Sequence, residues 1–281
     1  MRLLATDLDG TLLQPDGTVS HRNAEALQAA RAAGWFVVIA TGRPPFMVTE
    51  LATSLGDSVT HGVMANGSVV ATLPDLTVIR SVQFDIEVAV AVVRRLRAID
   101  PGFGFALATN AGFAHEPGFA ERLPAPQQVP ASPDALVSAK GATEAIKLMV
   151  FHHAHRAHEL LTVLPPLLAP TLAPTLAPLL APLLGEGLSV THMGADCVEV
   201  GPAGTDKGTG LRHLCEVLGV AAADVVAFGD EFNDHEMLRW AGLGVAMANA
   251  NETTRSIADE VTAANIDDGV ALVIERLLRT G

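Results

Sequence analysis

The sequence has no tyrosine, only two cysteines and few aromatic residues of any kind. Aromatic residues make up 4% of the 281 positions, so alanine, leucine and valine must fill most of the interior of a chain that is 49% hydrophobic. Cys197 and Cys215 are too few for a disulfide framework and stand at no zinc-binding spacing. We interpret them as buried thiols in a reducing compartment, which predicts a cytoplasmic location.

Positive charge is also scarce. The chain carries 18 Lys and Arg against 31 Asp and Glu, a formal net charge of −13, and it contains no run of five or six Lys and Arg. A nucleic-acid partner requires a basic face that neutralises phosphates, so we expect none. The acidic balance argues equally against adsorption to a membrane surface. It still permits a small anionic substrate, because a metal ion or a few local cations can reverse the field inside a cleft.

Long hydrophobic runs are missing as well. No segment offers about 18 uninterrupted apolar residues free of proline, so we expect no membrane-spanning helix. The first apolar stretch, Leu3 to Thr6, is too short for a signal peptide and runs straight into Asp7. The length suits two domains of a soluble protein.

Short apolar strands alternate with helices near the start of the chain. Strands are predicted at 2–6, 35–40 and 62–65, and helices at 20–33 and 45–55. Ser20 is the candidate N-cap of the first helix, and Gly34 follows its end. The alternation predicts a doubly wound parallel sheet with helices on both faces. Chemistry in such sheets sits at the carboxyl ends of the strands.

The pattern changes after about residue 83. A helix at 87–99, a hairpin within 102–115 and strands at 144–151 and within 188–200 predict an inserted α+β domain. The first pattern then resumes with elements at 207–218, 225–228, 234–241, 243–247 and 269–278. We therefore predict a core of residues 1–83 and 191–281 and an inserted cap of residues 84–190.

Two segments of the predicted cap have unusual composition. Residues 168–184 repeat every four residues with a proline in each repeat, which penalises a regular helix at every turn. We interpret this repeat as a tolerant surface element, because its spacing is not that of a proline-rich recognition motif. Histidines stand at 152, 153, 155 and 158. We interpret them as part of a solvated loop and helix start and not as a metal site.

The first group of chemically active residues is Asp7-Leu8-Asp9-Gly10-Thr11, directly after a predicted buried strand. Two close carboxylates repel each other unless a cation lies between them. Mg²⁺ prefers oxygen ligands and often takes one or two carboxylates together with substrate phosphate. A solvated loop with incidental acids is the alternative, and the position after a buried strand disfavours it.

Three further groups follow strands or begin helices. Thr41-Gly42-Arg43 could form an anion site or simply cap a helix. Lys207 could neutralise a phosphate or an aspartate, or it could be an exposed helix lysine. Residues 229–234 offer two acids, Asp230 and Asp234, and the amide of Asn233, or they could be an acidic helix cap. Each group is weak alone, whereas their order and their places at strand ends favour one shared site.

Together these motifs resemble the haloacid-dehalogenase superfamily of phosphatases, and within it the Cof-type branch with a large inserted cap. The resemblance covers residues 2 to about 278 and is weakest across the cap. It implies a Rossmann-like core. The segments that carry it are residues 7–13, 41–43, 66–67, 207–208, 229–234, 244–250 and 268–271.

The resemblance implies a role for each residue. Asp7 would be the nucleophile that forms an aspartyl-phosphate, and Asp9 would protonate the leaving oxygen and later activate water. Mg²⁺ would be bound by Asp7, the backbone carbonyl of Asp9 and Asp230, with Asp234 supporting the metal or the lysine. The phosphate would be held by Thr41, Gly42, Lys207 and Asn233, and Arg43 would contact the substrate.

The expected activity is Mg²⁺-dependent hydrolysis of small phosphate monoesters, such as sugar phosphates or cofactor phosphates. A phosphomutase on the same scaffold would return the phosphoryl group to its substrate, and the core motifs do not separate the two reactions. A non-catalytic sugar-phosphate sensor is disfavoured because every acid and cation that the chemistry needs is present.

Overall fold

The computed structural model describes residues 2–109, 112–119, 141–154, 187–191 and 197–280. The chain divides into two compact units. The core unit comprises Met1–Ser81 and Asp206–Gly281, and the inserted unit comprises Val82–Thr205. The proline repeat and the histidines at 155 and 158 lie outside the described residues.

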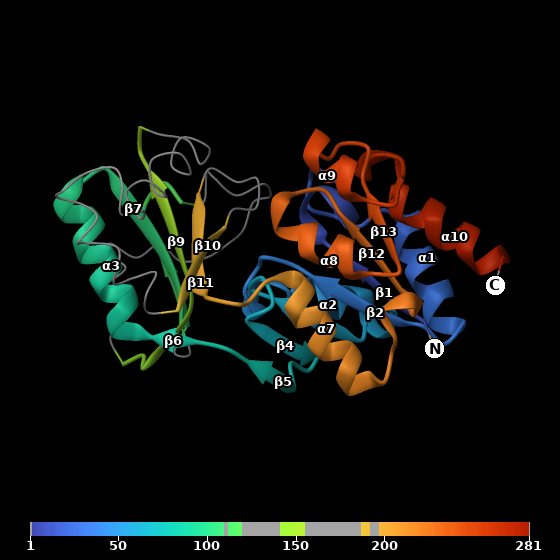
Figure 1. Cartoon of the computed structure of the whole chain (residues 1–281), viewed down its shortest axis with the longest axis horizontal. Coiled ribbons are helices and arrows are strands. Elements are labelled where there is room, and N and C mark those ends of the chain that lie inside the picture. Colours follow the sequence, from blue (N-terminus) through green and yellow to red (C-terminus); the bar gives the residue numbers. More distant parts are fainter. Residues whose placement is uncertain (1, 110–111, 120–140, 155–186, 192–196, 281) are drawn as a thin grey trace. The chain divides into compact units, whose positions relative to one another are not determined.

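The core unit is built on one eight-stranded sheet, in the order β14-β13-β12-β1-β2-β3-β4-β5 (Figure 1). The strands from β14 to β3 are parallel, and all of them except β14 were predicted from the sequence. β4 and β5, which the sequence analysis missed, extend the sheet as antiparallel strands. The strands are β1 (Leu3–Thr6), β2 (Phe36–Ala40), β3 (His61–Met64), β4 (Val69–Thr72), β5 (Val78–Ser81), β12 (Val225–Gly229), β13 (Leu243–Ala246) and β14 (Glu260–Val261).

Two pairs of helices accompany this sheet: α1 packs against α10, and α7 packs against α8. α7 and α8 contribute Leu211, Leu214 and Met237 to a cluster with Leu3, Ala5 and Val225 of the sheet. The helices are α1 (His21–Ala32), α2 (Thr49–Leu55), α7 (Lys207–Leu218), α8 (His235–Trp240), α9 (Glu252–Ile257) and α10 (Gly269–Thr280). Short 3₁₀ turns lie at Pro45–Met47, Gly56–Ser58, Ala222–Asp224, Phe232–Asp234 and Asn265–Asp267.

Local capping explains why α1 and α7 begin where the sequence predicted. The Ser20 side chain accepts a hydrogen bond from the backbone N–H of Asn23, the expected N-cap contact. Asp206 and Thr209 form a reciprocal capping box at the start of α7, and Gly219 ends that helix in the left-handed region. The capping box fixes Lys207 as the first residue of α7.

In the part of the inserted unit that the structure describes, a second sheet is accompanied by the long helix α3 (Ile86–Ile99). The order of its strands is β10-β11-β9-β7-β8, and β6 also pairs with β9. Every pairing is antiparallel, so the unit is α+β as predicted. The strands are β6 (Phe84–Asp85), β7 (Phe103–Thr109), β8 (Gly112–His115), β9 (Glu144–His152), β10 (Leu188–Thr191) and β11 (Val198–Pro202).

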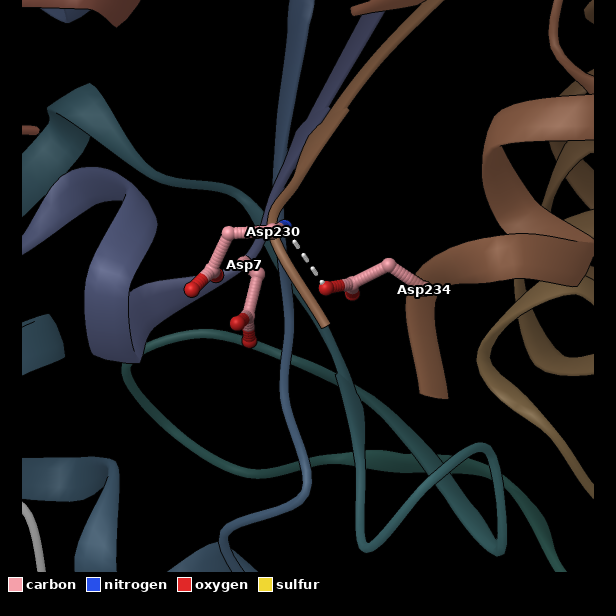
Figure 2. Close-up of side chains that lie close together, drawn as sticks. All are labelled: Asp7, Asp230 and Asp234. Carbon is pink, nitrogen blue, oxygen red and sulfur yellow. Dashed lines mark hydrogen bonds between the residues drawn. The ribbon is translucent and has the colours of Figure 1, made fainter. Parts of the chain in front are cut away.

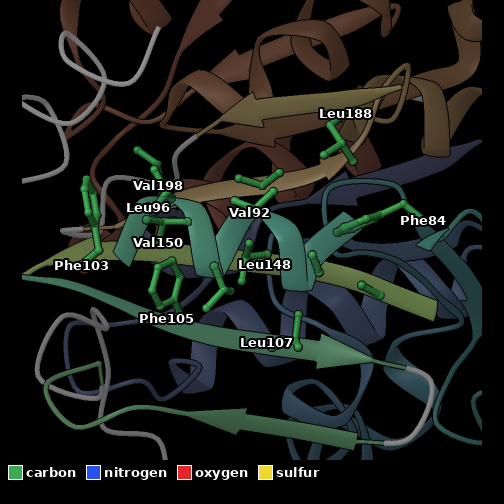
Figure 3. Packing of buried hydrophobic residues seen from close by; sticks show 14 of the residues in the cluster. Phe84, Val92, Leu96, Phe103, Phe105, Leu107, Leu148, Val150, Leu188 and Val198 are labelled. Atoms are coloured by element: carbon green, nitrogen blue, oxygen red, sulfur yellow. The ribbon is translucent and has the colours of Figure 1, made fainter. Parts of the chain in front are cut away.

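One face of this second sheet packs against α3 (Figure 3). Phe105, Leu148 and Val150 of the sheet meet Val92 and Leu96 of the helix in one buried cluster. The structure moves the second boundary of the unit from the predicted 190/191 to 205/206. Residues 191–205 belong to the inserted unit because β11 pairs with both β9 and β10.

No helix in the described parts of the chain is long and apolar enough to cross a membrane. Both cysteines are buried and free, as the sequence predicted.

Candidate active site

Asp7 lies where β1 ends, between two neighbouring strands of the core sheet. Its backbone N–H donates to the carbonyl of Phe228 on β12 at 3.0 Å, which fixes the start of the loop. The chain then turns at Gly10, whose φ is +81°. A Cβ at Gly10 would lie 2.2 Å from Oδ2 of Asp230, so only glycine lets the two segments approach this closely.

Lys207 is fully buried and joins two carboxylates. Its Nζ lies 2.7 Å from Oδ1 of Asp7 and 2.7 Å from Oδ1 of Asp234. Burial alone would lower the pKa of Lys207, but the carboxylates of Asp234 and Asp7 raise it above its ordinary value, so the lysine carries its charge. The exposed-lysine alternative is therefore wrong.

Asp234 is fully buried, and both of its carboxylate oxygens accept hydrogen bonds. Its Oδ2 accepts a hydrogen bond from the backbone N–H of Asp230 at 3.0 Å (Figure 2). The same oxygen accepts from the backbone N–H of Glu231 at 3.0 Å, while Oδ1 accepts from Nζ of Lys207. Asp230 is oriented separately, because its Oδ1 accepts from the hydroxyl of Thr11 at 2.8 Å. Asp234 thus organises both the lysine and the loop that carries Asp230.

The carboxylates of Asp7, Asp230 and Asp234 converge (Figure 2). Each offers an oxygen within 4.8 Å of the others, and this is the only group of potential metal-ligating side chains found among the described residues. Burial raises the pKa of Asp7 to about 7 and that of Asp230 to about 8; repulsion among the carboxylates adds to both shifts, and Lys207 opposes them. Three hard oxygen donors with this excess of negative charge fit Mg²⁺.

Asp9 is not one of these three carboxylates and pairs with Arg43. The Nε of Arg43 donates to one carboxylate oxygen of Asp9 at 2.8 Å, and its Nη2 donates to the other at 2.5 Å. Both side chains are about 9% exposed. This bidentate contact holds the carboxyl group of Asp9 in one orientation.

Thr41 lies at the end of β2, fully buried. Its backbone N–H donates to the backbone carbonyl of Val63 at 2.8 Å. Its hydroxyl oxygen accepts a hydrogen bond from the backbone N–H of Arg43 at 3.1 Å. Gly42 lies between them and is also buried. The carboxyl ends of β12, β1 and β2 are adjacent, so the three predicted motifs share one edge of the sheet.

Two asparagines for which the sequence predicted no role, Asn66 and Asn249, also contact the site. The amide of Asn233 donates to Oδ1 of Asn66 at 3.1 Å, and both side chains are buried. The amide of Asn249 donates to the carbonyl of Gly10 at 2.8 Å. The Asn-Gly pair after the strand could have indicated a left-handed turn. The contact of Asn66 with Asn233 could not have been predicted in this way, because Asn233 lies far along the chain.

Comparison with known proteins agrees with this geometry. Residues 4–274 match the family of haloacid dehalogenase-like hydrolases. Phosphatase YwpJ of Bacillus subtilis (strain 168) is 30% identical over 99% of this chain and 100% of its own length. Pyridoxal phosphate phosphatase YbhA of Escherichia coli (strain K12) is 28% identical over 97% of each chain.

A solved structure agrees with the fold over the same extent. The crystal structure of a haloacid dehalogenase-like hydrolase from Bacteroides thetaiotaomicron matches with a TM-score of 0.79 and 27% identity, over 98% of this chain and 99% of that one. Because the family match spans nearly the whole chain and full-length relatives are phosphatases, the chain belongs to the haloacid dehalogenase-like hydrolases and is a phosphatase of that family.

Proposed function

We propose that the enzyme hydrolyses small phosphate monoesters with Mg²⁺ through an aspartyl-phosphate on Asp7. The observation that carries the proposal is the buried contact of Lys207 with Asp7 and Asp234, beside the carboxylate of Asp230. Mg²⁺ bound by Asp7, Asp230 and the backbone carbonyl of Asp9 would neutralise charge on the phosphoryl group. Lys207 adds a fixed positive charge next to the nucleophile, which reduces its repulsion from a phosphate dianion.

The proposed reaction proceeds in two steps, formation and hydrolysis of the aspartyl-phosphate. In the first, a carboxylate oxygen of Asp7 forms a bond to phosphorus, the ester P–O bond breaks, and Asp9 gives its proton to the leaving oxygen. In the second, Asp9 takes a proton from water while the water oxygen attacks the phosphorus of the aspartyl-phosphate. Inorganic phosphate leaves, and the carboxylate of Asp7 is restored.

Thr41, Gly42 and Asn233 are proposed to hold the phosphoryl oxygens. Thr41 and Gly42 lie at the end of β2, next to the strand that carries Asp7. In the structure the hydroxyl of Thr41 accepts a hydrogen bond from the loop itself, which leaves its own proton to donate to a phosphoryl oxygen. Arg43 is proposed to contact the substrate and to orient Asp9, with which it pairs.

The proposed substrates are small phosphorylated metabolites, either sugar phosphates or cofactor phosphates. Pyridoxal phosphate is the first to test, since it is the substrate named for the 28% identical relative. The net charge of −13 would repel polyanions at long range, so we expect little activity on nucleic-acid ends or phosphoproteins. We also propose a cytoplasmic location, supported by two buried free thiols.

The test is a phosphate-release screen over sugar phosphates, nucleotides and phosphorylated cofactors with Mg²⁺ present. We expect turnover of at least one small ester, its loss in EDTA and inhibition by Ca²⁺, whose longer and more numerous bonds loosen the site. Release of inorganic phosphate distinguishes hydrolysis from return of the phosphoryl group to the substrate. Full activity after exhaustive EDTA treatment would contradict the metal requirement. Failure to release phosphate from any compound of the panel would contradict the proposed phosphatase function.

A further inference from the structure

A left-handed turn follows β3 and carries Asn66. Ala65, Asn66 and Gly67 have φ values of +49°, +53° and +83°. Residues other than glycine rarely adopt this conformation, so the two successive non-glycine residues, Ala65 and Asn66, must be stabilised by their surroundings.

Two backbone hydrogen bonds tie this turn to the loop after β2. The N–H of Ala65 donates to the carbonyl of Arg43 at 2.9 Å, and the N–H of Asn66 donates to the carbonyl of Thr41 at 3.1 Å. The turn therefore fixes the backbone on both sides of Gly42, where the proposed phosphate contacts lie.

The same turn packs against the beginning of α7. A Cβ at Gly67 would lie 2.1 Å from the carbonyl oxygen of Asp206, the N-cap residue directly before Lys207. A Cβ at Gly210 would lie 2.8 Å from the Cα of Gly67. Two glycines thus allow the turn and the first turn of α7 to touch backbone to backbone.

The side chain of Asn66 reaches a third element of the site. Its Oδ1 accepts from the Nδ2 of Asn233, and the two side chains are 7% and 9% exposed. The other end of the Asn233 carboxamide, Oδ1, is buried and has no hydrogen-bond partner among the described residues. A buried polar atom without a partner is costly, so this end is the one that a ligand would meet.

We propose that Asn66 is a positioning residue that fixes the carboxamide of Asn233 for phosphate binding, an inference that rests on the proposed function. Asn66 suits this task because its own carboxamide can partner either end of Asn233. When a phosphate oxygen requires a donor, both amides turn over together: Asn66 then donates to the oxygen of Asn233, and Nδ2 of Asn233 faces the phosphate.

The test distinguishes the contribution of the Asn66 side chain from that of its backbone conformation. Asn66→Gly keeps the left-handed turn accessible and removes the carboxamide, whereas Asn66→Ala removes the carboxamide and strains the turn. We expect both variants to bind inorganic phosphate roughly tenfold more weakly or worse, because one orienting contact to a phosphate ligand is lost. Both variants should lower the midpoint of thermal unfolding, because each leaves the buried Nδ2 of Asn233 without its acceptor, and Asn66→Ala should lower it further because it also strains the turn.

The measurement is calorimetric titration of the Mg²⁺-loaded protein with inorganic phosphate, repeated for Asn233→Ala and for the double variant Asn66→Gly/Asn233→Ala. Because Asn66 acts through Asn233, the double variant should bind phosphate no more weakly than Asn233→Ala alone. Leu76→Gly is the matched control. It makes the same kind of change at another residue with positive φ, +55°, in the turn between β4 and β5, and it should leave phosphate affinity unchanged.

Three results would overturn the inference: wild-type phosphate affinity in Asn66→Gly, effects of the two single variants that multiply in the double variant, or an Asn66→Gly protein that is unfolded by circular dichroism. Failure of the proposed function is a separate result. It would appear as wild-type protein that releases no phosphate from any ester while the phosphate titrations of the variants still follow the expected order.

Discussion

The two units both bury charged side chains, but they balance them differently. In the inserted unit, Lys147 of β9 and Glu199 of β11 form a buried ion pair, one charge against one. In the core unit, three carboxylates share the single buried Lys207. The first contact pairs one positive with one negative charge, whereas the second lacks two positive charges when all its acids are ionised. One divalent cation would supply the two missing positive charges. The balance of charges thus separates the ion pair of the inserted unit, which serves packing, from the carboxylate group of the core unit, which is suited to bind a cation.

The largest expected effect comes from removing the proposed nucleophile, Asp7. Asp7→Asn should lower kcat by roughly 10⁴-fold or more, because it removes the attacking oxygen and one proposed metal ligand. The fold should survive, since the contact of Asp7 with Phe228 uses the backbone. Steady-state kinetics and circular dichroism check this, with the exposed Asp57→Asn as the control. Turnover close to that of the wild type in purified Asp7→Asn protein would contradict the mechanism.

Asp9→Asn should have a smaller effect. Proton transfer by a positioned side chain contributes roughly 10²–10⁴ in rate, and the variant keeps the backbone carbonyl that is proposed to bind Mg²⁺. The Mg²⁺ concentration giving half-maximal activity should therefore stay at the wild-type value while formation and hydrolysis of the phosphoenzyme both slow. Rapid-quench kinetics measures the two steps, and unchanged burst and steady-state rates would exclude Asp9 as the acid–base group.

The pH dependence of Mg²⁺ binding should show the charge deficit directly. Burial raises the pKa of Asp7 to about 7 and that of Asp230 to about 8, so a bound cation must displace protons from them. Apparent affinity should rise with pH through this window and level off above it. Titration calorimetry in buffers of different ionisation enthalpy counts the released protons, and Asp230→Asn should release fewer. An affinity independent of pH from about 6 to about 9 would contradict this account.

The same shifts predict how metal-free protein responds to pH. Raised carboxyl pKa values mean that the folded state binds these protons more readily than the unfolded state does. The stabilisation is complete below the ordinary aspartate value of 3.8 and is lost as the pH rises through about 8. Thermal unfolding in EDTA should show a midpoint that falls over this range, and Mg²⁺ should reverse the fall.

The smallest effect on the site should come from breaking the buried ion pair of the inserted unit. Glu199→Gln leaves Lys147 buried without its partner charge and should cost about 3–5 kcal/mol of stability. Replacing both residues, as Lys147→Met with Glu199→Leu, should recover most of that loss. Mg²⁺ affinity should not change in either variant. A clear loss of Mg²⁺ binding in the double variant would show that the two charge systems are coupled.

The core could be predicted from sequence where a local signal marks each element. Apolar strands that run into polar residues located Asp7 and Asp230, and the predicted helix at 207–218 placed Lys207 at its start. The antiparallel strands β4 and β5 were missed because they are short and carry no helix between them to mark a crossover. The boundary at 205/206 depends on the pairing of β11 with β9, which is long-range information. The role of Asn66 was missed for the same reason, since its contact with Asn233 spans 167 positions.

The central place of β1 in the core sheet also has a consequence for the order of events during synthesis. β1 lies between β2 and β12, and about 220 residues separate β1 from β12 in the chain. At about 5–20 residues per second, the ribosome makes β12 roughly 10–45 s after β1. All strands of the inserted unit are made in that interval. Until β12 arrives, one edge of the apolar strand that leads to Asp7 stays unpaired, and such an edge is prone to pairing with other chains. Asp7 is therefore among the first residues made, and its surroundings are among the last to be completed.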